Sequence, residues 1–434
     1  MRISAELLGL LRDAKANPDD LGLRQILADW LEEHGDPERA EFVRLDCRGW
    51  IEERTARRDS LMASNLDAWI RPLEVRELTI ASSRGLLKVC GPSRYLLSRE
   101  LAQRDCIPEL AWIESLELRN LTAAESPALA TSPHWTCLNQ LHVENTQGNI
   151  DANVSPEFFG HSPHDWSAFR DFPSRETLRS LSFRSLDLGA AGLAALLAHP
   201  FPELRRLVLH AANLGDAGAE ALARSSCLPR LRSLEIVHSR VGSAGWVALA
   251  DWPGLATLER LIMQDNYPGE EGVAALARSP LCHSLTDWDL TALSRYFNDQ
   301  MPGRCLGPAG AIALATAPQP FGRLRRLSLA EHRIGVEGAR ALASSRVLPS
   351  LTALNLSANS LGDEGVRALV AAPWLPNLRE LHLSQNGLTD EGALALLDAP
   401  PLPELTALNL ISNMGMSVPI RQRLRQRFGE NLWL

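Results

Sequence analysis

The sequence lacks the features that mark several large classes of protein. None of its 434 residues belongs to an apolar run of about 18, the length a membrane-spanning helix needs. The N-terminal segment has neither the apolar core nor the small-residue cleavage site of a secretory signal. Lys and Arg number 44 against 52 Asp and Glu, a net charge of −8, which argues against a chain-wide nucleic-acid binder. We therefore expect a cytoplasmic protein with no membrane and no nucleic-acid partner.

The cysteines do not indicate a disulfide framework either. The seven cysteines are odd in number and widely scattered, and no Cys-x-x-Cys pair occurs. This usage supports neither a set of disulfides nor a zinc site, and it favours free thiols in a reducing compartment.

The motifs of common enzyme classes are also missing. There is no phosphate-binding glycine loop, no Gly-x-Ser-x-Gly and no His-Glu-x-x-His. The nearest approach to a ligand cluster is His161, His164 and Asp165, but a proline-containing turn gives these side chains no supporting geometry for zinc. We predict no catalytic residue, no metal and no cofactor. A metal-dependent hydrolase built on these three residues is the remote alternative, and a loop packed on the flank of the fold is the simpler interpretation.

A strong internal repeat is present instead. Nine leucines each open the pattern Leu-x-x-Leu-x-Leu or a close variant, and most are 27 residues apart, with one step of 26 and one of 39. They are Leu178, Leu204, Leu231, Leu258, Leu285, Leu324, Leu351, Leu378 and Leu405. An Asn follows at the ninth position in four units, as Asn266, Asn359, Asn386 and Asn413.

The two halves of each unit have different periods. Leu-x-Leu alternation predicts a short strand with its leucines on one face. The following alanine-rich stretch, such as 218–223, predicts a helix that packs closely on that strand. A single unit cannot bury its apolar face alone, so neighbouring units must stack. We expect the asparagines to bind backbone groups and form a ladder between units.

Acidic residues recur at the starts of the predicted helices. There they are expected to cap amides and to favour the helix dipole, rather than to form a cation site. The residues are Asp216, Glu270, Glu271, Glu337, Asp363, Glu364, Asp390 and Glu391.

The repeats resemble those of leucine-rich repeat proteins, in particular the ribonuclease-inhibitor-like subfamily. The resemblance implies an α/β solenoid with a curved parallel sheet on the concave side and helices on the convex side. Regular repeats are predicted over 178–415, and degenerate repeats with a long insertion near 146–175 over 51–177. A first, irregular repeat is expected at 75–80, and a C-terminal cap at 416–434.

Residues 3–47, within an N-terminal module predicted over 1–50, carry a second resemblance. Its runs Leu27-Ala-Asp-Trp-Leu-Glu-Glu-His-Gly-Asp36 and Arg39-Ala-Glu-Phe42 look like the bacterial repeat-companion domain, a short module whose biochemical role the resemblance does not supply. The residues themselves predict two or three short helices. Asp29, Trp30 and the 32–34 segment could form a catalytic or metal cluster, but a buried Trp beside a solvated acidic face explains them more simply.

Function is expected on the concave face, where the strand residues between the leucines point. The mixed charge signs there suit a folded protein partner, although these residues could also be only the solvated face of a scaffold. The candidate binding residues are Arg206, His210, Glu235, His238, Arg260, Gln264, Asp265, Asp287 and Asp289.

The 39-residue step adds a second candidate, because it inserts about twelve residues after a strand, near one rim of the concave face. The insertion has residue types common at binding hot spots, and an inert insertion is an equal alternative. Its candidate residues are Arg295, Tyr296, Phe297, Met301 and Arg304. Together these patterns predict a non-enzymatic scaffold that binds another protein. The alternative is a sensor or regulatory subunit of a bacterial signalling or defence complex.

Overall fold

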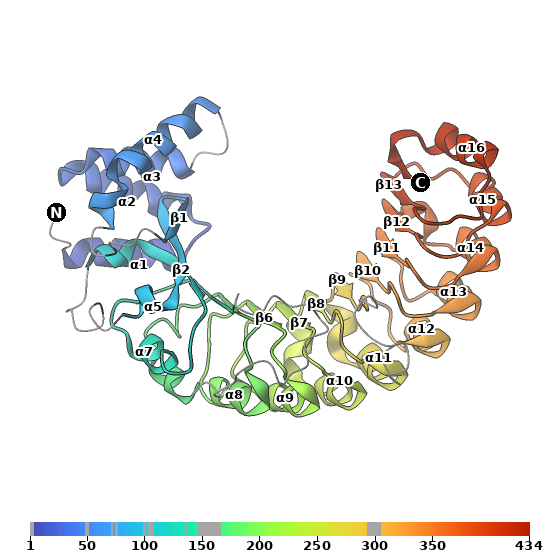
Figure 1. Ribbon diagram of the computed structural model, residues 1–434, viewed down its shortest axis with the longest axis horizontal. Helices are drawn as coiled ribbons and strands as arrows, with labels where there is room; N and C mark the ends of the chain where they lie inside the picture. The colour runs from blue at the N-terminus through green and yellow to red at the C-terminus, as the bar shows by residue number, and fades with distance from the viewer. Residues whose placement is uncertain are drawn as a thin grey trace.

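The chain forms an open arc with its sheet on the inner side and its helices on the outer side (Figure 1). The computed structural model describes residues 4–47, 52–70, 73, 77–98, 101, 108–135, 137–145, 166–292 and 305–434. A group of helices stands at the N-terminal end of the arc, and the C-terminus lies at the other end. Within the described residues, no helix is long and apolar enough to cross a membrane.

The described strands form one sheet of 14 strands in strict chain order. Only β1 and β2 pair antiparallel, and every later neighbour pairs parallel, as the repeats predict. The strands are β1 (Thr79–Ser83), β2 (Leu86–Pro92), β3 (Ile113–Arg119), β4 (Gln140–Glu144), β5 (Ser180–Arg184), β6 (Arg206–His210), β7 (Ser233–Val237), β8 (Arg260–Ile262), β9 (Asp287–Asp289), β10 (Arg326–Ser328), β11 (Ala353–Asn355), β12 (Glu380–His382), β13 (Ala407–Asn409) and β14 (Leu432–Trp433).

The helices fall into an N-terminal group and a convex row. The N-terminal group is α1 (Ala5–Ala16), α2 (Leu21–Glu33), α3 (Pro37–Cys47) and α4 (Glu52–Trp69). Two short helices follow, α5 (Ser93–Leu96) and α7 (Ser126–Thr131). The row is α8 (Gly189–Leu196), α9 (Gly215–Ala223), α10 (Ser243–Ala250), α11 (Gly269–Arg278), α12 (Gly307–Ala315), α13 (Gly335–Ser344), α14 (Gly362–Val370), α15 (Asp390–Leu397) and α16 (Val418–Phe428). Single 3-10 turns join some units: η1 (Pro108–Trp112), η3 (Ser167–Asp171), η4 (Pro253–Thr257), η5 (Pro280–His283), η7 (Leu375–Asn377) and η8 (Gly429–Asn431).

The repeated leucines fill the space between sheet and helices. Leu354, Leu381 and Leu408 face one another across three neighbouring strands in register, and all are buried. Burying a leucine contributes roughly 1.5–3 kcal/mol, and each unit supplies several. The core is therefore one continuous column of stacked side chains rather than a set of separate globules. This confirms the predicted leucine-rich-repeat solenoid.

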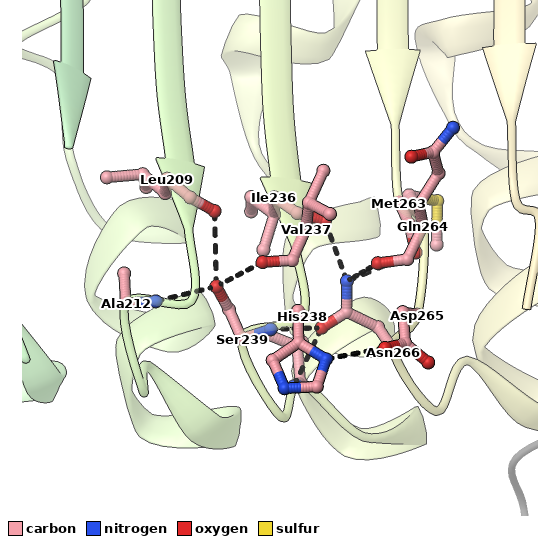
Figure 2. A network of polar contacts seen from close by, with 11 residues as sticks. Leu209, Ala212, Ile236, Val237, His238, Ser239, Met263, Gln264, Asp265 and Asn266 are labelled. Carbon is pink, nitrogen blue, oxygen red and sulfur yellow. Dashed lines mark hydrogen bonds and ion pairs between the residues drawn. The ribbon is translucent and has the colours of Figure 1, made fainter. Parts of the chain in front are cut away.

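The predicted asparagine ladder is present. Asn386 Oδ1 accepts a hydrogen bond from Asn359 N at 2.9 Å, and Asn413 Oδ1 accepts one from Asn386 N at 2.9 Å. Asn266 makes the same kind of link to the preceding unit, where it accepts from Ser239 N at 3.2 Å and donates to Ile236 O at 2.7 Å (Figure 2). The ladder satisfies backbone groups in the turns that leave the strands, where no sheet partner is available.

Two of the acidic residues at the helix starts cap amides of a neighbouring helix. Asp216 Oδ1 accepts from Gly242 N at 2.6 Å, and Asp390 Oδ1 accepts from Ser417 N at 2.6 Å. In both cases the amide belongs to the start of the next unit's helix rather than to the carboxylate's own. The expected capping of helix-start amides is therefore confirmed for these two residues, with the amide supplied by the neighbouring helix. Stacking places these carboxylates beside the following helix, so the caps also hold neighbouring units together.

Asp363 offers a test of these caps. Its carboxylate accepts from Thr389 N at 2.8 Å and Gly392 N at 2.9 Å. Burial acts to raise the pKa of Asp363, but the hydrogen bonds from Thr389 and Gly392 outweigh it and hold the pKa below 3.8. We expect Asp363→Ala to lower the free energy of unfolding by about 1–2 kcal/mol at pH 7 in urea titrations.

The same cap predicts a pH dependence. A lowered carboxyl pKa stabilises the fold above the ordinary pKa, and this contribution is lost as the pH falls through the folded-state value. The difference in unfolding free energy between wild type and Asp363→Ala should therefore become smaller as the pH falls. Glu364→Ala is the control, because Glu364 forms only an exposed ion pair with Arg340. An equal loss for Glu364→Ala would contradict a specific role for the cap.

The N-terminal helices are anchored to the first parallel strands by buried charged groups. Lys15 Nζ donates to Ile113 O at 2.7 Å, and the buried Arg24 lies 3.7 Å from Glu114. The Arg39 guanidinium lies 4.7 Å from the Trp69 ring centre and 4.4 Å from that of Trp112. The boundary predicted at residue 50 lies between α3 and α4, and because α4 packs on α3 the helical part runs to Trp69.

The acidic residues of α2 have ordinary structural partners. Asp29 and Glu32 both pair with Arg44 of α3, at 2.6 and 2.5 Å. Trp30 is largely buried, and its ring stacks on His34 with 3.9 Å between ring centres. These contacts are those of a solvated acidic face beside a buried Trp.

The two ends of the sheet differ from the regular units. The irregular repeat expected at 75–80 is wrong for its described part, because β1 turns back at Arg84 and Gly85 to pair antiparallel with β2. Both turn residues have positive φ (51° and 83°), which produces a tight hairpin. At the other end α16 buries Leu424, and β14 adds to β13. These elements cover the open ends of the core, which a solenoid requires.

Candidate protein-binding surface

The concave face consists of the strand side chains that alternate with the core leucines. The described part of this face includes two hollows. The N-terminal hollow, of about 570 Å³, lies over β1 to β6, and the C-terminal hollow, of about 440 Å³, lies over β8 to β12. The polar side chains of the N-terminal hollow include Lys88, Cys90, Glu117, Arg119, His142, Glu144, Ser182, Arg184 and Arg206. Those of the C-terminal hollow include Arg260, Asp287, Asp289, Arg326, Ser328, Asn355, Glu380 and His382.

Three of the predicted residues form one charged group between the hollows. Arg206, Glu235 and Arg260 come from β6, β7 and β8. Arg206 Nη2 lies 2.8 Å from Glu235 Oε1, and Arg260 Nε lies 3.9 Å from the same oxygen. The two arginine side chains are about half exposed, whereas Glu235 is buried. The pairing leaves both guanidinium groups accessible to an acidic group on a partner.

A second group lies where the strands end. His238 Nδ1 and Asp265 Oδ2 are 2.5 Å apart, and both residues adopt positive φ in the turns after β7 and β8 (Figure 2). His210, at the end of β6, is partly buried. Burial, with the nearby charges of Arg184 and His238, lowers the pKa of His210. A neutral imidazole at this position suits hydrogen bonding better than ion pairing.

The remaining predicted residues lie on β9 or just after β8. Gln264 Nε2 donates to Asp289 Oδ2 at 2.7 Å, and Asp289 Oδ1 accepts from Thr291 N at 2.9 Å. Asp287 pairs with Arg326 across the neighbouring strand. Asp287 and Asp289 line the C-terminal hollow, where they place negative charge.

The other sequence candidates lie outside the described residues. These are the insertion residues Arg295, Tyr296, Phe297, Met301 and Arg304, and the trio His161, His164 and Asp165.

Sequence reasoning missed the N-terminal hollow. Glu117, His142 and Glu144 offer ligand atoms that all lie within 4.8 Å of one another, and among the described residues they are the one such group of potential metal ligands. They occupy the same alternate strand positions as the regular candidates, but in two degenerate units. Extending the strand alternation into those two units would have identified these three residues as concave-face candidates.

The thiol of Cys90 belongs to the same group. Its Sγ donates to Glu117 Oε1 at 2.9 Å. Burial, the hydrogen bond to Glu117 and the charge of that carboxylate raise the pKa of Cys90 to about 12. The thiol is therefore protonated at neutral pH and acts as a donor. Burial lowers the pKa of His142, although the nearby carboxylates of Glu117 and Glu144 act to raise it.

The two hollows differ in charge. Four cations line the N-terminal hollow, from Lys88, Arg119, Arg184 and Arg206, against the two carboxylates of Glu117 and Glu144. Three carboxylates line the C-terminal hollow, from Asp287, Asp289 and Glu380, against two arginines, Arg260 and Arg326. The face therefore changes from net positive to net negative along the arc.

The repeated strand–turn–helix units and their asparagine ladder define a leucine-rich-repeat solenoid. Residues 324–343, 347–370 and 375–397 match the family model described as Leucine Rich repeat. No curated protein matches the sequence. Among solved structures, the chain is similar to one titled "Crystal structure of Rad7 and Elc1 complex in yeast", with 16% identity, 93% of this chain and 88% of that chain covered, and a TM-score of 0.48. Nothing about function follows from a likeness at that level.

Proposed function

We propose that this protein is a cytoplasmic, non-enzymatic scaffold that binds another protein through its concave face. The observation that carries the proposal is the pair of oppositely charged hollows joined by the Arg206–Glu235–Arg260 group. Curved solenoids present extended concave surfaces of this kind to their partners. Complementary charge along such a surface steers association and fixes orientation.

The change from net positive to net negative charge along the concave face also defines the chemistry of the partner. A folded protein with an acidic patch toward one end of its contact surface and a basic patch toward the other would match the two hollows. A sensor or regulatory subunit of a bacterial signalling or defence complex is the alternative, and it would use the same surface. The identity of the captured partner separates the two roles.

The test neutralises the central group without leaving an unpaired charge. We expect the triple variant Arg206→Gln, Glu235→Gln and Arg260→Gln to lose the partner that wild type captures from a native lysate, as identified by mass spectrometry. Removing the paired charges together avoids the penalty of a lone buried carboxylate. With the purified partner, affinity should fall by about tenfold or more, measured by calorimetry.

The matched control lies on the convex side. Arg340 and Glu364, whose side chains are 2.7 Å apart, and Arg367 belong to α13 and α14. Changing all three to Gln removes the same residue types and the same net charge. This control should keep the partner, and both variants should unfold at nearly the wild-type temperature. Retained binding by the concave variant, or equal loss by the convex one, would reject the proposed surface.

A further inference from the structure

Two adjacent strands bring three potential metal ligands together in the N-terminal hollow. Glu117 comes from β3, and His142 and Glu144 come from β4. The register pairs Glu117 with His142, so these two side chains are direct cross-strand neighbours on the concave face. Their ligand atoms and that of Glu144 lie within 4.8 Å of one another. His142 Nε2 is 3.7 Å from Glu144 Oε2.

We propose that this site binds one Zn²⁺ ion through Glu117, His142 and Glu144. An imidazole nitrogen with two carboxylate oxygens is a ligand set that zinc accepts. Three protein ligands leave the fourth tetrahedral position for water or for a group from a binding partner. The two carboxylates also match the charge of a divalent ion.

A buried hydroxyl beside the site is the second observation that points to a ligand. Ser182 of β5 pairs with His142 in the register and lines the same hollow. Its residue is 7% exposed, and its Oγ is buried without a hydrogen-bond partner. A buried polar group without a partner costs free energy. Water or an exogenous ligand in the metal's fourth position would supply a partner from within the hollow.

Neighbouring groups already orient one ligand. The Cys90 thiol donates to Glu117 Oε1, and Arg119 Nε lies 3.4 Å from the same oxygen. The second carboxylate oxygen, Oε2, takes part in neither contact. Hydrogen bonds of this kind fix the direction in which a metal ligand points. The positive charge of Arg119 competes with the ion, so we expect reversible binding that depends on ionic strength.

The experiment uses the full chain, freed of metal and of any histidine tag, with a phosphine reductant to keep the thiols reduced. Titration with ZnCl₂ in a calorimeter should give one equivalent bound. CoCl₂ should give visible d–d absorption with a tetrahedral intensity. His142→Ala and Glu144→Gln should each weaken Zn²⁺ binding by about tenfold or more. Unchanged thermal unfolding of these metal-free variants would show that the loss is local.

The chain offers a matched control at the other hollow. His382 Nε2 lies 3.9 Å from Glu380 Oε2 on β12, and within the described residues no third metal ligand joins this pair. His382→Ala should therefore bind Zn²⁺ like wild type. The proposal is overturned if wild type binds no stoichiometric Zn²⁺, if His142→Ala binds as tightly as wild type, or if His382→Ala weakens binding equally. None of these outcomes depends on partner capture.

Discussion

Replacing Asn386 with alanine is expected to lower the free energy of unfolding by about 2–4 kcal/mol, because several buried backbone groups lose their partner at once. The Asn386 amide oxygen accepts from Asn359 N at 2.9 Å and Leu361 N at 3.3 Å. Its amide nitrogen donates to Leu356 O at 2.9 Å. The side chain thus links two units through groups that water does not reach. Urea unfolding, followed by far-ultraviolet circular dichroism, measures the loss.

Asn355 provides the matched control. It lies on β11, in the unit that precedes Asn386, but its side chain accepts one local hydrogen bond, from Ser357 N at 3.0 Å, on the partly exposed concave face. Asn355→Ala should cost less than about 1 kcal/mol. If both variants lost the same free energy of unfolding, the ladder asparagine would stabilise the fold no more than one hydrogen bond in an ordinary turn.

Regular periodicity made the architecture predictable. The 27-residue spacing required a stack of identical units, and the ninth-position asparagines required buried backbone partners, so the curved sheet and the ladder both followed from the sequence. It was harder to predict which helix each carboxylate caps. A carboxylate such as Asp216 lies near two helix starts once units stack, and sequence spacing does not show which amide is closer.

The candidate site was less predictable for a related reason. Alternation identifies which side chains face the concave side, but only strand register shows which ones meet. Glu117 and His142 are 25 residues apart in units whose leucine pattern is degraded, and an irregular spacing hides their pairing. The hairpin at β1 and β2 was missed because its Leu-x-Ile pattern equals that of a repeat strand. Its direction is set by the turn at Arg84 and Gly85.

The anchor of the N-terminal helices predicts an unusual dependence of stability on pH. Burial lowers the pKa of Lys15 from 10.5 to about 8, and it outweighs the opposing charge of Glu114. Between these two values the unfolded chain holds a proton that the folded chain has released. Stability therefore rises with pH across this window, and the full difference corresponds to roughly 3 kcal/mol. Below about pH 8 the folded protein carries the cost of a buried ammonium group.

Lys15→Met should abolish this dependence, since methionine fills a similar volume without a charge. Relative to this variant, the unfolding free energy of wild type should rise by roughly 2 kcal/mol between pH 7 and pH 9.5. Urea titrations at the two pH values measure it, and subtraction of the variant cancels the titration of other groups. Lys88, the other lysine of the sequence, lies partly exposed on β2, so Lys88→Met should keep the wild-type slope. A slope unaffected by Lys15→Met would mean that the ammonium group stays charged against Ile113 O, and that this hydrogen bond compensates for its burial.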